Sequence, residues 1–149
     1  MNKKRGREEW DCLHIAARNG QYAICKLLLD RGADPKVEDC NEETPFFHAA
    51  AAGHLSVCKL LAQCSPRDAV WNPNHKFWTP LHAAAEAGYY DVCEWLCKEL
   101  DKDPDFKYWF HVGVIPGEIP APLQLAMDNG HNEVCEVLER FNVPAENNE

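Results

Sequence analysis

The chain has 149 residues, 46% of them hydrophobic, and a formal net charge of −9. This length and apolar content fit one compact domain with a buried core. The acidic balance argues against nucleic-acid binding, which needs a basic face or stripe, and favours a protein partner with a neutral or basic surface. The one basic cluster, within residues 3–7, is typical of a solvated tail.

The sequence shows no sign of membrane insertion or export. No apolar run approaches the roughly 18 residues of a membrane span, and the basic start is followed by Glu8, Glu9 and Asp11 rather than by a signal-peptide core. We therefore expect the eight cysteines to be reduced thiols. The sequence predicts a monomer in a reducing compartment, either cytoplasmic or nuclear.

Four ten-residue segments share the pattern of a short helix. In TPLHAAAEAG, Thr79 is a suitable N-cap, Pro80 fits the first helical position, and Gly88 can adopt the left-handed conformation that ends a helix. The last glycines of the four segments are 33, 35 and 42 residues apart, which indicates a structural repeat. The segments are Asp11–Gly20, Thr44–Gly53, Thr79–Gly88 and Ala121–Gly130.

Each of these glycines is followed by an apolar-periodic segment, which predicts a second helix in every copy. The segments read AICKLLL from Ala23, SVCKLLA from Ser56, DVCEWLC from Asp91 and EVCEVLE from Glu133. Two short helices cannot bury their apolar faces alone. At least about three copies must therefore stack for stability.

These motifs, with RGADP at Arg31–Pro35, resemble the ankyrin repeat family over about residues 7–143. The resemblance implies an all-α fold: an ankyrin-repeat solenoid of four helix-turn-helix units, with short β-hairpin loops and one insertion between repeats 3 and 4. The two outer copies are expected to act as caps. Within a single domain 1–149, the expected boundaries are 7–38, 39–73, 74–105 and 116–143 for the repeats, about 106–115 for the aromatic insertion, and 144–149 for a polar tail.

The copies depart from the pattern at their helix starts. Asp11 replaces the threonine of the first copy but can still cap, whereas Ala121 in the fourth has no side-chain acceptor and is expected to cost about 1 kcal/mol. The family's histidine, which bridges adjacent turns, is present as His14 and His82. Phe47 and Gln124 replace it, so the other junctions must be held differently.

The copies also differ where their second helices end. Ser65, before a proline, and Asn142 can end a helix, whereas Leu100 favours a third-copy helix that continues toward Asp101. Asn142 and the residues after it predict a solvated cap and a loose tail.

Four cysteines occupy one slot, five residues after each repeat glycine: Cys25, Cys58, Cys93 and Cys135. Free cysteine behaves as a small hydrophobe, so we predict that they lie in the core and resist alkylation. Stacked copies lie about 10 Å apart, which is too far for disulfides between equivalent cysteines.

No catalytic motif stands out, so we predict no enzyme, no cofactor and no metal site. His54 and His131 follow repeat glycines, where the family commonly has histidine, and are expected to be structural. A thiol- or metal-dependent activity remains the alternative. It requires a shared pocket for Cys12, His14, Cys93 and Cys97.

The resemblance also implies a binding surface, because partners of the family contact the hairpin before the helix cap and the two residues before the glycine. Trp10 and Trp78 stand directly before a cap residue, where they either bind a partner or pack on a neighbouring hairpin. Trp10, Arg18, Trp78 and Glu86 are the predicted centre. The predicted partner-binding residues are Arg7, Trp10, Arg18, Asn19, Glu43, His75, Lys76, Trp78, Glu86, Asp128 and Asn129.

The interval before the fourth copy exceeds the usual period by about nine residues, within 101–120. This insertion is rich in aromatic residues, and it either folds back on the repeats or offers a second contact site through Tyr108, Trp109 and Phe110. The predicted function is non-catalytic binding of a protein, as inhibitor or adaptor. Docking into a larger complex through residues 101–120 is a further alternative.

Overall fold

The computed structural model describes residues 11–65, 72–102 and 120–146, with backbone alone for 142–146. Within these ranges every regular element is a helix, and no strand is present. None of the described helices is long and apolar enough to cross a membrane. The helices are α1 (Cys12–Arg18), α2 (Tyr22–Asp30), α3 (Pro45–Ala52), α4 (Leu55–Cys64), α6 (Pro80–Ala87), α7 (Tyr90–Asp101), α9 (Pro122–Asp128) and α10 (Asn132–Glu146).

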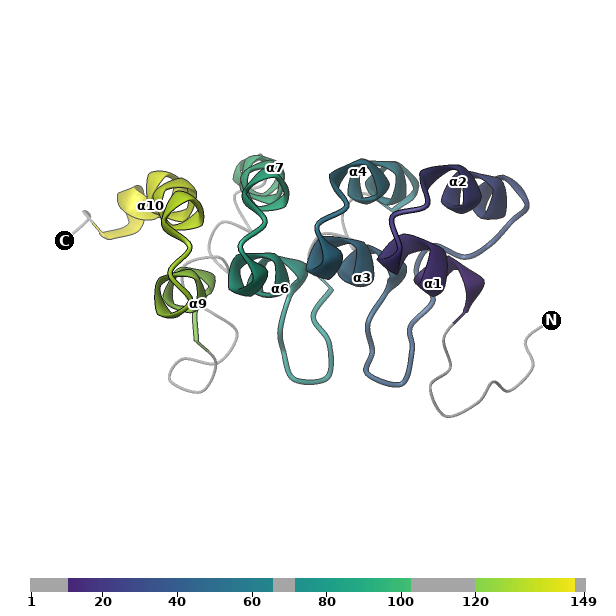
Figure 1. Ribbon diagram of the computed structural model, residues 1–149, viewed down its shortest axis with the longest axis horizontal. Coiled ribbons are helices and arrows are strands. Elements are labelled where there is room, and N and C mark those ends of the chain that lie inside the picture. The colour runs from purple at the N-terminus through teal and green to yellow at the C-terminus, as the bar shows by residue number, and fades with distance from the viewer. Residues whose placement is uncertain (1–10, 66–71, 103–119, 147–149) are drawn as a thin grey trace. The chain divides into compact units, whose positions relative to one another are not determined.

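The chain divides into two compact units, residues 1–80 and 81–149. In the first unit, α1 packs on α2 and α3, and α4 packs on α2 and α3, so two helix pairs stack side by side (Figure 1). In the second unit, α10 packs on α7 and α9. The predicted all-α fold of paired helices is confirmed.

Most of the predicted helix starts and stops are confirmed. The Asp11 carboxylate accepts a hydrogen bond from the Leu13 N–H, and the Thr44 hydroxyl accepts one from the Phe47 N–H, whereas Ala121 makes no capping bond. Gly20, Gly53, Gly88 and Gly130 all have the expected positive φ.

The helix ends give one correction. α4 ends before Ser65 and α7 continues to Asp101, both as predicted. α10, however, continues past Asn142 to Glu146, so the predicted helix end at Asn142 is wrong. Residues 147–149 of the predicted tail lie outside the described residues. Asn142 tolerates the left-handed conformation but does not require it.

The predicted β-hairpin loops are tight turns without a strand ladder in the described residues. The Asp39 N–H donates to the Glu43 carbonyl over 3.1 Å, and the Asn74 N–H donates to the Trp78 carbonyl over 2.8 Å. Each turn contains a non-glycine residue at positive φ, which favours glycine. These residues are Glu42, with φ 64°, and Phe77, with φ 66°.

Two histidines join neighbouring helix pairs, as their predicted structural role requires. His54 Nε2 lies 3.0 Å from the Arg18 carbonyl oxygen, and His131 Nε2 lies 3.0 Å from the Glu86 carbonyl oxygen. The two rings also fill the space above Gly20 and Gly88. A Cβ atom at Gly20 would lie 2.5 Å from the His54 ring, and one at Gly88 would lie 2.6 Å from the His131 ring. Glycine is therefore required at both places for space as well as for φ.

The core contains most of the repeated cysteines. Cys25, Cys58 and Cys93 are fully buried, but Cys135 is only partly buried. Cys97, four residues after Cys93, is buried too. Desolvation raises the pKa of Cys58 and Cys93 to about 12. A thiol reacts as its thiolate, so burial and this pKa both suppress reactivity.

We expect native alkylation to label the exposed Cys12, Cys40 and Cys64 first and Cys135 more slowly. The buried cysteines should react only after unfolding, because reagents cannot reach them and their thiols stay protonated. Mass spectrometry of tryptic peptides after timed iodoacetamide treatment measures this order. Labelling of Cys58 as fast as that of Cys40 in the native protein would contradict the described core.

Candidate functional site

The predicted contact residues of the first unit lie on exposed turns and helix ends. Arg18 and Asn19 are exposed at the end of α1, and His75 and Lys76 are exposed in the turn before α6. His75 Nδ1 also lies 3.1 Å from the Asn41 carbonyl oxygen. Trp78 is half-buried at the end of the same turn. The structure thus gathers His75, Lys76 and Trp78 into one hairpin.

Glu43 differs from these residues because its carboxylate already has partners within the protein. Its Oε2 accepts a hydrogen bond from Asn74 Nδ2 over 2.9 Å, and its Oε1 lies 3.5 Å from His48 Nε2. This contact and the bond from His75 to Asn41 join the two neighbouring hairpins. Within the first unit, polar contacts therefore hold these two turns together where Phe47 replaces the bridging histidine.

Phe77 is the hairpin residue that the sequence interpretation missed. Its side chain is 45% exposed and its backbone is held at φ 66°. Positive φ is unfavourable for a bulky residue, and such backbone strain concentrates at functional sites. A signal was present in the sequence: Phe77 and Glu42 both stand two residues before a capping threonine, at the position where the tight turn needs positive φ.

The remaining predicted residues fall in the second unit or outside the described ranges. Glu86, Asp128 and Asn129 are exposed at helix ends, and Asp128 accepts a hydrogen bond from Gln124 Nε2 over 2.8 Å. The Asn129 amide donates to the Leu125 carbonyl over 2.8 Å. Arg7, Trp10, Tyr108, Trp109 and Phe110 lie outside the described residues.

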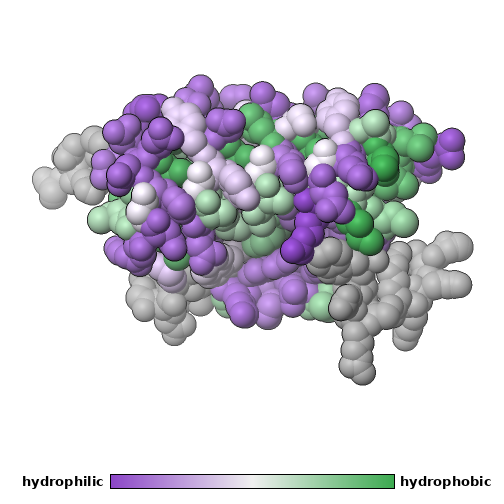
Figure 2. All heavy atoms as spheres, viewed as in Figure 1, coloured by the Kyte–Doolittle hydropathy of each residue, from purple (hydrophilic) through white to green (hydrophobic). Residues whose placement is uncertain are grey.

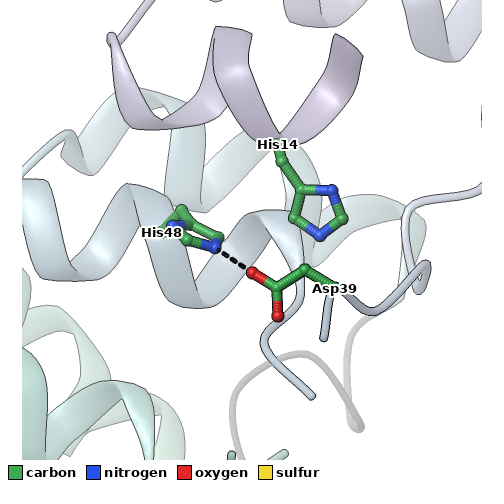
Figure 3. A group of neighbouring side chains, drawn as sticks. All are labelled: His14, Asp39 and His48. Atoms are coloured by element: carbon green, nitrogen blue, oxygen red, sulfur yellow. Dashed lines mark hydrogen bonds and ion pairs between the residues drawn. The ribbon is translucent and has the colours of Figure 1, made fainter. Parts of the chain in front are cut away.

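A buried cluster of His14, Asp39 and His48 lies beside the hairpin before α3 (Figure 3). His14 comes from α1, His48 from α3, and Asp39 from the turn, and both rings point toward the carboxylate. His48 Nε2 lies 2.9 Å from Asp39 Oδ2, while Asp39 Oδ1 accepts the N–H groups of Asn41 and Glu43 over 2.9 Å each. The two imidazole rings meet edge to face, with centroids 5.4 Å apart.

The hydrogen bonds of His14 identify its tautomer. The Asp11 N–H donates to Nδ1 over 3.2 Å, so Nδ1 carries a lone pair, and Nε2–H donates to the Glu43 carbonyl over 2.9 Å. Burial lowers the pKa of His14, although its bond to Glu43 acts in the opposite direction. His14 is therefore a neutral structural bridge to the next hairpin. His82 makes the equivalent bond to the Pro120 carbonyl in the second unit.

The pKa of Asp39 follows from its hydrogen bonds. Burial acts to raise it, but the N–H groups of Glu43 and Asn41 and the His48 ring outweigh this effect and hold the pKa below its usual value. Asp39 is therefore an anion among three donors. The potential ligand atoms of this cluster lie within 4.8 Å of one another, but binding a metal requires His14 Nε2 to lose its proton and its carbonyl partner. The contacts fit a structural cluster better than a metal site.

The cysteines named for a thiol- or metal-dependent activity lie in different environments. Cys12 is exposed whereas His14 is buried, and Cys93 and Cys97 are both buried core residues. Desolvation raises the pKa of Cys97 beyond that of an ordinary thiol. Within the described residues, the one group with three potential ligands is the histidine–aspartate cluster.

Comparison with known proteins identifies the repeats. A family model of ankyrin repeats, in three copies, matches residues 8–108. The Arabidopsis thaliana protein XBAT31 is 28% identical over 141 residues, which cover 93% of this chain and 31% of the relative. The tyrosine-protein kinase HTK16 of Hydra vulgaris is 29% identical over a segment that covers 78% of this chain and 14% of the length of the kinase.

A third relative, the ankyrin repeat-containing protein ITN1 of Arabidopsis thaliana, is 36% identical over 70% of this chain and 21% of its own. The chain thus spans less than a third of the length of these relatives. Ankyrin repeats are non-catalytic modules that bind protein partners. The match over residues 8–108 and the stacked helix pairs show that this chain belongs to the ankyrin repeat family.

Proposed function

We propose that the chain binds a protein partner through the hairpin before α6, with Phe77 and Trp78 as apolar anchors. Phe77 carries the proposal: it combines an unfavourable φ of 66° with a side chain that is 45% exposed. The fold alone gains little from holding an aromatic ring in this way. Contact with a partner supplies a reason for the strain, because aromatic residues dominate binding hot spots.

The flanking residues support a surface around these anchors. Asn74 Oδ1 accepts the N–H groups of Lys76 and Trp78 over 2.9 and 3.1 Å, so the turn is rigid before any partner arrives. A rigid loop loses little conformational freedom on binding, which favours affinity. Arg18 and Asn19 are exposed in the same unit and are proposed as further contacts.

The partner implied by this surface is a protein with an apolar pocket for an aromatic ring. The net charge of −9 favours a partner whose surface is neutral or basic overall. The consequence of binding is either inhibition of the partner or its attachment to another protein. Glu86, Asp128 and Asn129 are exposed and belong to the proposed contacts of the second unit.

We expect Phe77→Gly to weaken partner binding with little effect on stability. Glycine relieves about 1–2 kcal/mol of backbone strain, which roughly offsets the lost burial of half a phenylalanine side chain. Loss of a true hot spot costs about 2 kcal/mol or more of affinity, which is more than tenfold. The partner is first captured with the wild-type chain, and the purified pair is then measured by isothermal titration calorimetry, with urea denaturation in parallel.

Glu42→Gly is the matched control, because Glu42 has nearly the same φ in the preceding turn and is exposed. This change is expected to stabilise the fold by about 1 kcal/mol and to leave affinity unaltered. Trp78→Ala should again reduce affinity. Equal affinities for wild type, Phe77→Gly and Trp78→Ala would refute the proposed anchors.

A further inference from the structure

The first repeat exposes apolar side chains at three positions that the second and fourth repeats bury; in the third repeat, Ala83 and Trp95 at two of these positions are half-buried. Ile15, Ile24 and Leu27 are 46%, 44% and 49% exposed. They lie five residues before Gly20 and four and seven residues after it. The residues at the same three positions relative to the repeat glycine are His48, Val57 and Leu60 in the second repeat and Leu125, Val134 and Val137 in the fourth, and all six are buried.

In the second repeat these positions face the preceding repeat. His48, for example, meets the ring of His14 on the preceding helix pair, and α4 packs on α2. We call Ile15, Ile24 and Leu27 the N-terminal stacking face. No helix pair precedes it within the described residues. A terminal repeat normally carries a polar outer face, so the first copy differs from the cap expected from the sequence. Figure 2 shows apolar surface at the end of the first unit where α1 and α2 lie.

The last repeat has a different outer side. In earlier copies, two positions face the repeat that follows. In the last copy, both of these positions carry exposed polar residues. Gln124 takes the place of the bridging histidine, and Glu139 takes the place of the buried Cys97. Met127 is exposed at 55% where earlier copies have a buried alanine. This largely polar side fits a cap, so the N-terminal stacking face needs another occupant.

Charge does not favour head-to-tail stacking of two chains. Between α7 and α10, Arg140 Nη1 lies 3.8 Å from Glu94 Oε2. The same two positions at a head-to-tail junction are Asp30 of one copy and Glu136 of the other, so the ion pair has no counterpart there. Asp30 already pairs with Lys26 Nζ at 3.7 Å within its own helix. The chain has a net charge of −9, but the charges of α1, α2 and their flanking residues are nearly balanced. Two first repeats can therefore meet without strong charge repulsion.

We propose that the N-terminal stacking face binds the same face of a second copy of this chain, forming a two-fold dimer. In such an isologous contact one apolar patch serves both partners. It buries Ile15, Ile24 and Leu27 of each copy, as their counterparts in the second and fourth repeats are buried. It also closes on itself, whereas head-to-tail stacking generates open filaments. The dimer replaces the monomer expected from sequence and leaves the proposed hairpin anchors outside the contact.

The test is sedimentation velocity of the full chain over a dilution series from millimolar to low micromolar protein. The wild type should form a concentration-dependent dimer. The double variant Ile24→Glu, Leu27→Glu should raise the dissociation constant by at least about a hundredfold, because each glutamate buries a charge in the apolar contact. Circular dichroism tests whether the variant remains folded. We expect that it does, because both substituted side chains are exposed.

The matched control is Ser56→Glu, Gln63→Glu, which adds the same charge at exposed positions of α4 outside the stacking face. It should dimerise like the wild type. A monomeric wild type throughout the series would overturn the proposal. A dimer that survives Ile24→Glu, Leu27→Glu would overturn it as well, because the contact then lies elsewhere.

Discussion

Replacing Asp39 by alanine is expected to destabilise the protein by about 3–5 kcal/mol, close to the whole stability of many domains. The change leaves the N–H groups of Asn41 and Glu43 without their acceptor and the His48 ring without its partner at 2.9 Å. All of these groups surround a carboxylate whose side chain is fully buried. Urea denaturation followed by circular dichroism measures the loss.

The protein contains its own control for this prediction. Asn74 stands at the position of Asp39 in the next repeat, where its Oδ1 accepts two backbone N–H groups in the same way, and Ala83 stands at the position of His48. Asp39→Asn should therefore keep the turn and lose only the bond between the carboxylate and His48 Nε2. Its cost is expected to be about 1–2 kcal/mol.

The double replacement Asp39→Asn, His48→Ala gives the second repeat the natural combination of the third. It should be more stable than the sum of the two single changes predicts, with a coupling of about 1–3 kcal/mol. Strict additivity in this double-mutant cycle would mean that His48 and Asp39 do not stabilise each other. Asp39→Ala without measurable destabilisation would contradict the described cluster itself.

The second large effect is a loss of stability in mild acid. Burial lowers the pKa of His82 to about 4, although its bond to the Pro120 carbonyl acts in the opposite direction. The unfolded chain has the ordinary pKa near 6.5, so between these values the unfolded state binds the extra proton. The contribution is complete above about pH 6.5 and is lost as pH falls toward 4. It amounts to about 3 kcal/mol for this residue.

Urea denaturation at a series of pH values from 7 to 4 measures this loss. His82→Gln should flatten the profile, because glutamine keeps an N–H donor for the carbonyl and does not titrate. His14 shifts in the same direction, so part of the slope should remain. His75→Gln, at an exposed hairpin, is the control and should leave the profile steep. If His82→Gln retains the full wild-type slope, the pKa assignment is wrong.

The sequence predicted those parts of the fold that depend on local chemistry. The cap by Asp11, the missing cap at Ala121 and the repeat glycines each follow from one residue and its neighbours. The structural role of His54 also followed, because it repeats with the glycine. The course of α10 beyond Asn142 did not, since the sequence at a helix end permits more than one outcome.

The sequence interpretation missed residues whose role depends on the turn conformation. His48 lies one residue beyond the expected histidine position, and only the folded turn brings Asp39 against it. Phe77 looks like an ordinary loop aromatic until its positive φ is known. The anchors proposed at Trp10 and in residues 103–119 lie outside the described ranges and stay predictions.

The rings of His54 and His131 above Gly20 and Gly88 have a consequence for engineering the array. Each contact joins two copies, because one copy supplies the imidazole ring and the copy before it supplies a glycine without a side chain. Among the described residues, no atom lies within 4 Å of a Cβ built on Gly130. An added fifth module should therefore begin its second helix with histidine, and a shuffled array should keep every glycine ahead of such a ring.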